Sequence, residues 1–301
     1  MKTAIENAQK DTEKNSEKEK KIREMLRRRT TGTIMAAVML SLWVLRGWPL
    51  RIGFIAMMVM SMWEIYGAFR VRGARPVRWV GMAFAILSMP AYRVLGLASI
   101  MPLVAVCCML GLACVVIRGK VDFDSAVSTL FPLIYPGIMV CLIFPLQDIE
   151  PVLHSVLALG LVFLVALMND LFAYEIGMRF GKRKLSPVLS PKKTVEGAVA
   201  GLVASLLFAM AVPWVATLVT SRIPYFAAYA APLPPMWKFA LTGLLGGAAA
   251  QIGDLTASMV KRYCGIKDFG AIFPGHGGML DRMDSVLFTG VVVYVFFAIC
   301  V

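Results

Sequence analysis

Residues 152–173 read VLHSVLALGLVFLVALMNDLFA, a predominantly apolar run that ends close to the polar pair Asn169 and Asp170. An α-helix needs about 20 consecutive apolar residues to cross the hydrocarbon core of a bilayer. Asp170 makes this run unusual, because an ionisable side chain at the edge of the hydrocarbon is costly and often marks a functional site. The stretch therefore predicts a transmembrane helix with a functional carboxylate near one end.

The rest of the chain repeats this apolar pattern. Of its 301 residues 59% are hydrophobic and 16% are charged, whereas an ordinary soluble domain is about half apolar and about a quarter charged. We expect an all-α polytopic membrane protein with about nine transmembrane helices. The expected spans are residues 31–45, 49–69, 77–94, 97–117, 127–146, 152–173, 194–219, 237–260 and 284–301.

The distribution of basic residues predicts how these spans are oriented. If the N-terminus is cytoplasmic, 26 of the 31 Lys and Arg residues fall on the inner side, and an excess of positive charge is typical of cytoplasmic loops. We therefore expect a cytoplasmic N-terminus and a C-terminus on the outer side. The net charge of +13 then reflects orientation and contact with anionic membrane lipids, and no nucleic-acid partner is expected.

The first 30 residues differ from the rest, because they are basic and contain few large apolar side chains before Ile22. Ile22, Met25 and Leu26 recur at helical spacing, which is typical of a helix on the membrane surface. A disordered basic tail is the alternative for residues 1–16. The expected division is a basic cytoplasmic tail or interfacial helix (1–30), an N-terminal transmembrane region (31–150) and a C-terminal transmembrane catalytic region (151–301).

Several acidic residues fall at one level of the membrane in this topology. Ionisable groups in or near the hydrocarbon are costly, so their convergence indicates a functional site at the cytoplasmic surface. The residues at this level are Asp170, Asp254, Asp281 and Asp284, with Glu64 and Glu196 as candidates for a supporting role.

The polar segment 258–285 reads SMVKRYCGIKDFGAIFPGHGGMLDRMDS and separates the last two expected spans. Two sets of polar residues recur at helical spacing, so each set should share one helix face. The sets are Asp254, Ser258, Lys261 and Arg262 before the loop, and Asp281, Asp284 and Ser285 after it. The glycine-rich turn 274–278 lets backbone amides approach phosphate oxygens. Carboxylates beside Lys, Arg and His suit a Mg²⁺–polyphosphate site; a solvated charged loop is the alternative.

A second polar segment, 190–197, reads SPKKTVEG. Ser190 before Pro191 predicts a helix N-cap with proline at the first helical position. Such a helix N-terminus can bind an anion, and Lys192 and Lys193 lie beside it. The alternative is a well-capped helix that follows a positively charged inner loop, which explains the lysines but not Asp170 at the membrane boundary.

These two segments resemble the phosphatidate cytidylyltransferases, also called CDP-diacylglycerol synthases. Residues 258–284 match that family's signature at every specified position, and residues 190–197 are similar to a second typical stretch. The chain departs from the family at 171–174, where smaller residues are expected after Asp170. The resemblance implies that CTP and phosphatidate react, with help from Mg²⁺, to give CDP-diacylglycerol and pyrophosphate. It also implies a multi-pass protein of the bacterial inner membrane, with a cytoplasmic active site and a homodimeric assembly.

The hypothesis assigns a role to each candidate residue. Asp254 and Asp281 are expected to be metal ligands, with Asp284 as a third candidate, and a second cation is left open. Positive charge for the phosphates is expected from Lys192, Lys193, Lys261, Arg262 and Lys267. Phosphate oxygens are expected to be oriented by Ser190, Gly277 and Gly278. His276 is expected to donate a hydrogen bond to the leaving pyrophosphate, and Asp170 to contact substrate.

Three other functions are the alternatives to this hypothesis. A CDP-alcohol phosphotransferase would carry an Asp-x-x-Asp-Gly-x-x-Ala-Arg run, which the sequence lacks. A CTP-dependent lipid kinase would release CDP instead of pyrophosphate. An ion-coupled transporter would place its acids near the membrane midplane in broken helices. A soluble-type nucleotide site is not expected, because no GxxxxGK[ST] run is present.

Overall fold

The computed structural model describes residues 25–26, 30–35, 37–119, 121–275 and 277–299. The expected tail or interfacial helix of residues 1–30 therefore lies almost wholly outside the described residues. Residues 30–35 and 37–45 are helical, as the first expected span requires.

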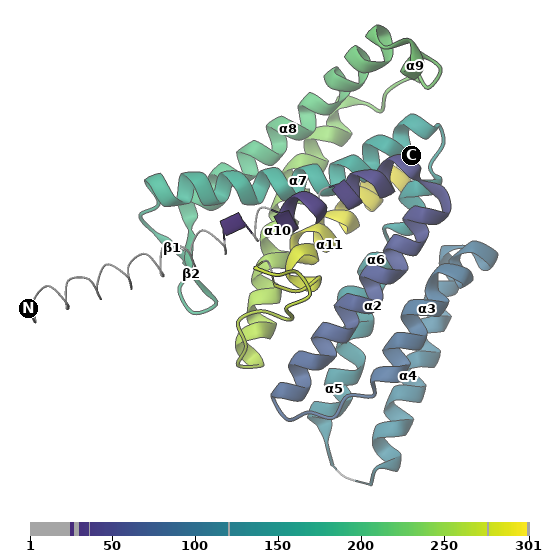
Figure 1. Cartoon of the computed structure of the whole chain (residues 1–301), viewed down its shortest axis with the longest axis vertical. Coiled ribbons are helices and arrows are strands. Elements are labelled where there is room, and N and C mark those ends of the chain that lie inside the picture. Colours follow the sequence, from purple (N-terminus) through teal and green to yellow (C-terminus); the bar gives the residue numbers. More distant parts are fainter. Residues whose placement is uncertain (1–24, 27–29, 36, 120, 276, 300–301) are drawn as a thin grey trace, which may run out of the picture.

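The described chain is mainly helical (Figure 1). Its elements are α2 (Gly47–Val71), α3 (Arg78–Leu95), η1 (Leu97–Ser99), α4 (Ile100–Ile117), α5 (Phe123–Pro132), η2 (Leu133–Ile138), α6 (Met139–Cys141), η3 (Phe144–Asp148), α7 (Val152–Phe180), β1 (Lys184–Ser186), β2 (Ser190–Thr194), α8 (Val195–Arg222), α9 (Pro224–Ala227), α10 (Met236–Tyr263), α11 (Leu280–Tyr294) and η4 (Val295–Ile299).

Among the described residues, six helical segments are long and apolar enough to cross a membrane. They are Gly47–Val71, Leu97–Ile117, Phe123–Asp148, Val152–Phe180, Val195–Arg222 and Leu280–Ile299. The chain is therefore an integral membrane protein with several spans. α3 and α10 are helical where spans were expected, but they do not reach the apolarity of these six segments. A count of nine spans stays a prediction.

The expected span 127–146 is not one regular helix. α5 ends at Pro132, and the chain continues through η2, where Tyr135 has non-helical torsions of φ −120° and ψ 105°. Pro136 explains this break, because proline removes a helical hydrogen bond and pushes the preceding residue out of the α region. In the sequence these residues form one apolar run, from which the interruption was not predicted.

The C-terminal helices pack closely around one another. α7 packs along α8, and α10 packs against both α8 and α11 (Figure 1). Gly253 on α10 lies against the backbone carbonyl of Asp284 on α11, so that a β-carbon at position 253 would collide with it. Small residues let membrane helices approach this closely. The packing brings Asp254 on α10 next to the first two turns of α11.

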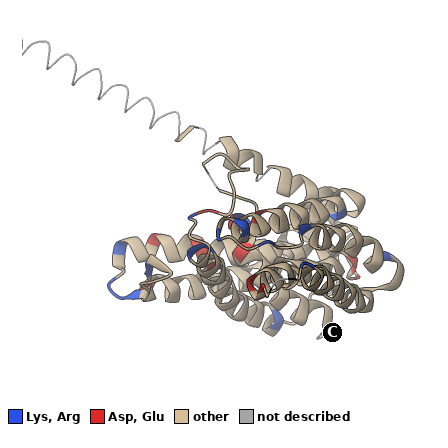
Figure 2. Ribbon diagram, turned by 90° about the horizontal axis from the view of Figure 1, so that it is seen from below, with Lys and Arg blue, Asp and Glu red and all other residues tan. Residues whose placement is uncertain are grey.

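A short hairpin departs from the expected all-α architecture. β1 and β2 pair antiparallel, with Lys184 opposite Thr194 and Ser186 opposite Ser190. The hairpin lies at one end of α7 and α8 (Figure 1). Charged residues are sparse along the helices and gather in a few places, and both signs of charge meet near the middle of the view in Figure 2.

Candidate active site

Three aspartates from three helices meet in the C-terminal region. Asp284 on α11 interacts electrostatically with Asp254 on α10 and with Asp170 on α7. Asp170 in turn interacts with Asp254 and with Lys193. Asp284 is 8% exposed, and the Asp254 side chain is 27% exposed. The structure therefore gathers three of the predicted acids into one partly open cluster, although they are up to 114 residues apart in the sequence.

Hydrogen bonds from uncharged side chains hold Asp170 in this cluster. Ser285 Oγ donates to Asp170 Oδ2 at 3.1 Å, and Asn169 Nδ2 donates to Asp170 Oδ1 at 3.2 Å. Asn169 is itself oriented by Gln251, whose Nε2 donates to Asn169 Oδ1 at 2.9 Å and to the carbonyl of Ala198 at 2.8 Å. Asp170 is thus fixed by contacts that join α7, α8, α10 and α11. Sequence reasoning did not identify the roles of Asn169 and Gln251, although each is a polar residue within an apolar run.

Lys193 forms an ion pair with Asp254 and so connects the hairpin to α10. Lys193 lies on β2, and Glu196 at the start of α8 holds the two residues that precede β1, at the same open end of the hairpin. Glu196 Oε2 accepts a hydrogen bond from the amide of Lys182 at 3.0 Å, and Oε1 accepts one from the amide of Arg183 at 3.2 Å. These contacts place one cation beside two of the three aspartates, Asp254 and Asp170.

The prediction that Ser190 caps a helix is wrong. Ser190 begins β2, and α8 starts five residues later with Thr194 as its N-cap. Thr194 Oγ1 accepts a hydrogen bond from the amide of Gly197 at 3.2 Å, and the Thr194 backbone is extended, as an N-cap requires. Because residues 190–194 pair with β1, the Ser190-Pro191 signal marks the return strand of a hairpin. No helix N-terminus for anion binding exists at Ser190.

Asp281 organises the loop between α10 and α11. Lys261 Nζ donates to Asp281 Oδ1 at 2.7 Å, while Asp281 Oδ2 accepts from the amides of Phe269 at 2.8 Å and Gly278 at 3.0 Å. Both oxygens of this carboxylate, which is 8% exposed, are therefore engaged by the protein. The geometry differs from the sequence-based hypothesis, in which Asp281 is a metal ligand and Lys261 neutralises phosphate.

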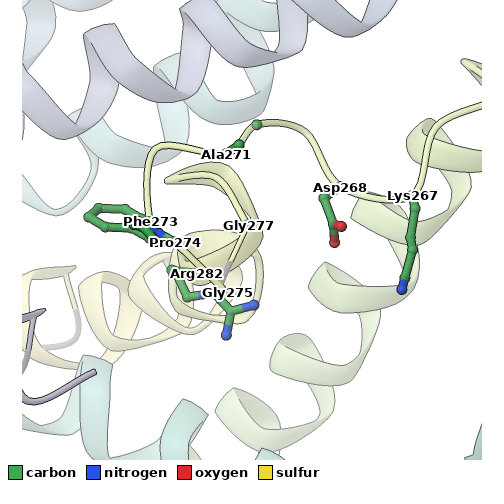
Figure 3. Close-up of a pocket in the computed structure, with 9 residues that line it drawn as sticks. Lys267, Asp268, Ala271, Phe273, Pro274, Gly275, Gly277 and Arg282 are labelled. Atoms are coloured by element: carbon green, nitrogen blue, oxygen red, sulfur yellow. The ribbon is translucent and has the colours of Figure 1, made fainter. Parts of the chain in front are cut away.

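Residues of this loop and Arg282 line a pocket of about 480 Å³ that is open to the surface. Figure 3 shows Lys267 and Asp268 on one side of the loop, with Phe273 and Arg282 on the other. The lining residues are Lys267, Asp268, Gly270, Ala271, Phe273, Pro274, Gly275, Gly277 and Arg282. Gly275 and Gly277 have φ values of 78° and 83°, which the glycine-rich turn requires. A pocket with two cations and a glycine-rich wall can accommodate an anionic group such as a polyphosphate.

The remaining predicted residues lie at the edge of this region. Arg262 makes long contacts, with Nε 3.5 Å from the carbonyl of Leu189 and Nη1 3.4 Å from that of Ile266. Lys192 is exposed on β2. His276 lies outside the described residues, so the structure gives no position for its predicted contact with the leaving group.

Glu64 is the acidic residue whose contact sequence reasoning missed. It lies on α2, is 4% exposed, and accepts hydrogen bonds from the amides of Met279 and Leu280, both at 2.9 Å. An acid within an apolar run was the only sequence signal, and it indicated no partner for Glu64.

The acidic side chains of the site are of the chemical type that binds Mg²⁺. Among the described residues, no group of three or more His, Cys, Asp or Glu side chains is arranged to hold a metal ion. Mg²⁺ commonly binds through one or two carboxylates together with substrate phosphates and water, so a complete protein cage is not required. Asp254 and Asp284 interact electrostatically and are candidates of this kind, with Lys193 paired to Asp254 and the Ser285 amide donating to Asp284. Both oxygens of Asp281 are engaged by Lys261 and two backbone amides.

The fold and site define a membrane enzyme in which carboxylates from α7, α10 and α11, lysines and a glycine-rich loop come together near the start of α11. The sequence model of the cytidylyltransferase family matches residues 26–300. The chain therefore belongs to the cytidylyltransferase family.

Comparison with individual proteins also finds members of this family. Phosphatidate cytidylyltransferase 5, chloroplastic, of Arabidopsis thaliana is 28% identical over 324 residues, which cover 97% of this chain and 76% of that protein. The phosphatidate cytidylyltransferase of Staphylococcus saprophyticus is 37% identical over 57% of this chain and 58% of its own length. That of Synechocystis sp. is 43% identical over 42% of this chain and 38% of its own length. The match thus spans less than two thirds of the two bacterial relatives.

Proposed function

We propose that this chain transfers the cytidylyl group of CTP to phosphatidate, giving CDP-diacylglycerol and pyrophosphate. The relatives named above carry this activity in their names. The observation that carries the proposal for this chain is the cluster of Asp170, Asp254 and Asp284 with Lys193. Asp254 and Asp284 lie on α10 and α11, the two helices that flank the glycine-rich loop.

For this reaction the protein mainly has to position the substrates and neutralise their phosphate charge. A phosphate oxygen of phosphatidate attacks the α-phosphorus of CTP, and the bond to the bridging oxygen breaks and releases pyrophosphate. The nucleophile is already an anion, so no strong general base is needed. Lys193, Lys267 and Arg282 supply positive charge for the phosphates, and Lys192 and Arg262 add charge at the rim. The amide of Gly277, in the pocket wall, is a candidate to orient a phosphate oxygen.

We assign the Mg²⁺ site to Asp254 and Asp284, with Asp170 as a supporting acid. When bound, the ion neutralises phosphate charge and orients the triphosphate. Asp281 then acts through the loop, because Lys261 and two backbone amides occupy its oxygens. Ser190 remains a candidate to orient phosphate oxygens, whereas the Gly278 amide already donates to Asp281. His276 remains the candidate donor to the leaving pyrophosphate.

The proposed location follows from the substrates. CTP is soluble and phosphatidate lies in the bilayer, so their reaction requires a site at the membrane surface. The positive-inside distribution supports a cytoplasmic N-terminus, an outer C-terminus and a cytoplasmic active site in the inner membrane of a bacterium. We also propose that the chain has nine spans, that residues 151–301 form the catalytic region, and that the protein is a homodimer.

The decisive experiment follows the products. Detergent-purified enzyme is given phosphatidate, Mg²⁺ and labelled nucleoside triphosphates, and the released phosphates are separated. Pyrophosphate that appears only with CTP, lipid and Mg²⁺ together would support the proposal. Release of CDP with phosphorylation of a lipid would instead indicate a CTP-dependent lipid kinase, and the absence of any turnover would reject both.

A further inference from the structure

Glu64 reaches from the N-terminal region into the loop between α10 and α11. Its Oε1 accepts the amide of Met279 and its Oε2 accepts the amide of Leu280, each at 2.9 Å. The side chain is 4% exposed, so both carboxylate oxygens are used inside the protein. Glu64 is therefore placed to support the site and not to bind a substrate itself.

The two amides need an outside partner. α11 begins at Leu280, and Met279, at the N-cap position, makes no side-chain capping hydrogen bond. The first amides of a helix have no partner within the helix, and a carboxylate there gains from charge-assisted hydrogen bonds and from the helix dipole. Glu64 performs this capping from a position 215 residues away in the sequence.

The loop also packs on the same carboxylate. A β-carbon at Gly270 would lie 2.5 Å from Glu64 Oε1, and one at Gly278 would collide with both carboxylate oxygens. Neither glycine has a positive φ, so the glycines at these positions are explained by the space that Glu64 occupies. The carboxylate thus contacts the loop both before and after the glycine-rich turn.

We propose that Glu64 is a positioning residue for the nucleotide-binding loop. By capping α11 and filling the space beside Gly270 and Gly278, it fixes the loop that carries Lys267 and the helix turn that carries Asp284. The N-terminal region therefore contributes to the active site although none of its residues was predicted to touch substrate. The kinetic part of this inference rests on the proposed function, whereas the structural part does not.

The structural part is tested by hydrogen–deuterium exchange on the full-length protein in detergent. Glu64→Gln removes the charge and one of the two acceptors, and we expect the amides of Met279 and Leu280 to exchange at least about tenfold faster. Ser61→Ala is the matched control, because Ser61 is buried on the same helix and its hydroxyl has no hydrogen-bond partner among the described residues. Unchanged exchange over residues 267–285 in Glu64→Gln would overturn the inference.

A kinetic measurement separates positioning from general damage. For Glu64→Gln we expect KM for CTP to rise about tenfold while KM for phosphatidate stays near that of Ser61→Ala. The thermal midpoint should fall below that of Ser61→Ala, because two hydrogen bonds to a charged group are weakened. An equal rise of both KM values would show a merely structural role. If the unsubstituted enzyme does not turn over CTP, the proposed function fails, but the exchange experiment still decides the role of Glu64.

A compensating pair covers the case in which Glu64→Gln does not fold. Gly270→Ala should lose activity because its β-carbon meets Glu64 Oε1. Glu64→Asp retracts the carboxylate by one methylene, so the double variant should recover at least about threefold over Gly270→Ala alone. Simple additivity of the two losses would contradict the proposed contact.

Discussion

Lys261 donates a hydrogen bond to Asp281 at 2.7 Å and so joins the last turn of α10 to the first turn of α11. The lysine side chain is 13% exposed and the aspartate side chain 3%. This pair is well shielded from water. Removal of either partner would leave an unpaired buried charge, which is strongly destabilising.

The first prediction concerns this pair. Asp281→Asn should lower turnover at least about tenfold, since hydrogen bonds to a charged group are worth about 1.5–3 kcal/mol each. Lys261→Met should lower it similarly, and the double variant should lose less than the two single losses combined. The Mg²⁺ concentration at half-maximal rate should not move in Asp281→Asn. A large increase in it would restore Asp281 as a metal ligand.

The second prediction concerns the proposed Mg²⁺ site. Asp254→Asn and Asp284→Asn should each raise the Mg²⁺ concentration for half-maximal activity by at least about tenfold, because even an indirect partner of a metal ion changes affinity by about 10–100-fold. Titration of Mg²⁺ in the cytidylyl-transfer assay measures this. Glu175→Gln is the control, since Glu175 pairs with Arg179 on the surface of α7 and is 40% exposed. An unchanged Mg²⁺ requirement in both variants would contradict the assignment.

The third prediction concerns the start of α8. Thr194→Val removes the capping hydroxyl that accepts the Gly197 amide, and it should lower the free energy of unfolding by about 1 kcal/mol. Thr194→Ser should restore the cap. Ser190→Ala should leave the thermal midpoint unchanged, because Ser190 lies on β2. Thermal unfolding of the three variants in one detergent compares them, and a larger drop for Ser190→Ala than for Thr194→Val would contradict the corrected cap.

The fourth prediction concerns the close approach of α10 and α11. Gly253→Ala places a β-carbon against the Asp284 carbonyl, and overpacking of this kind costs about 1–3 kcal/mol. We expect lower stability and at least about tenfold lower turnover, because Asp254 and Asp284 must move apart. Gly67→Ala is the control, since the nearest atom to its added β-carbon is 4.0 Å away. Equal behaviour of the two variants would show that helix separation does not control activity.

The helical class and the grouping of acids followed from the sequence alone. Apolar runs located the helices, and the alternation of membrane sides brought Asp170, Asp254 and Asp284 to one level. This succeeded because a bilayer imposes its thickness on every span, so that spacing along the chain converts into depth.

Sequence and structure differ where local signals competed or where partners were distant. Ser190-Pro191 and Thr194 both fit the start of a helix, and only pairing with β1 decides for Thr194. Asp281 has the spacing of a metal ligand, but its partners at Phe269 and Lys261 depend on how the loop folds back. The partner of Glu64 lies 215 residues away, beyond any periodicity in the sequence.

The capping of α11 by Glu64 limits how this protein can be recombined. A chimera that joins residues 1–150 of one family member to residues 151–301 of another would work only if the donor carries an acid at the position of Glu64 and the recipient keeps room for it beside Gly270 and Gly278. The boundary at residue 150 therefore divides the amino-acid sequence without creating two interchangeable parts.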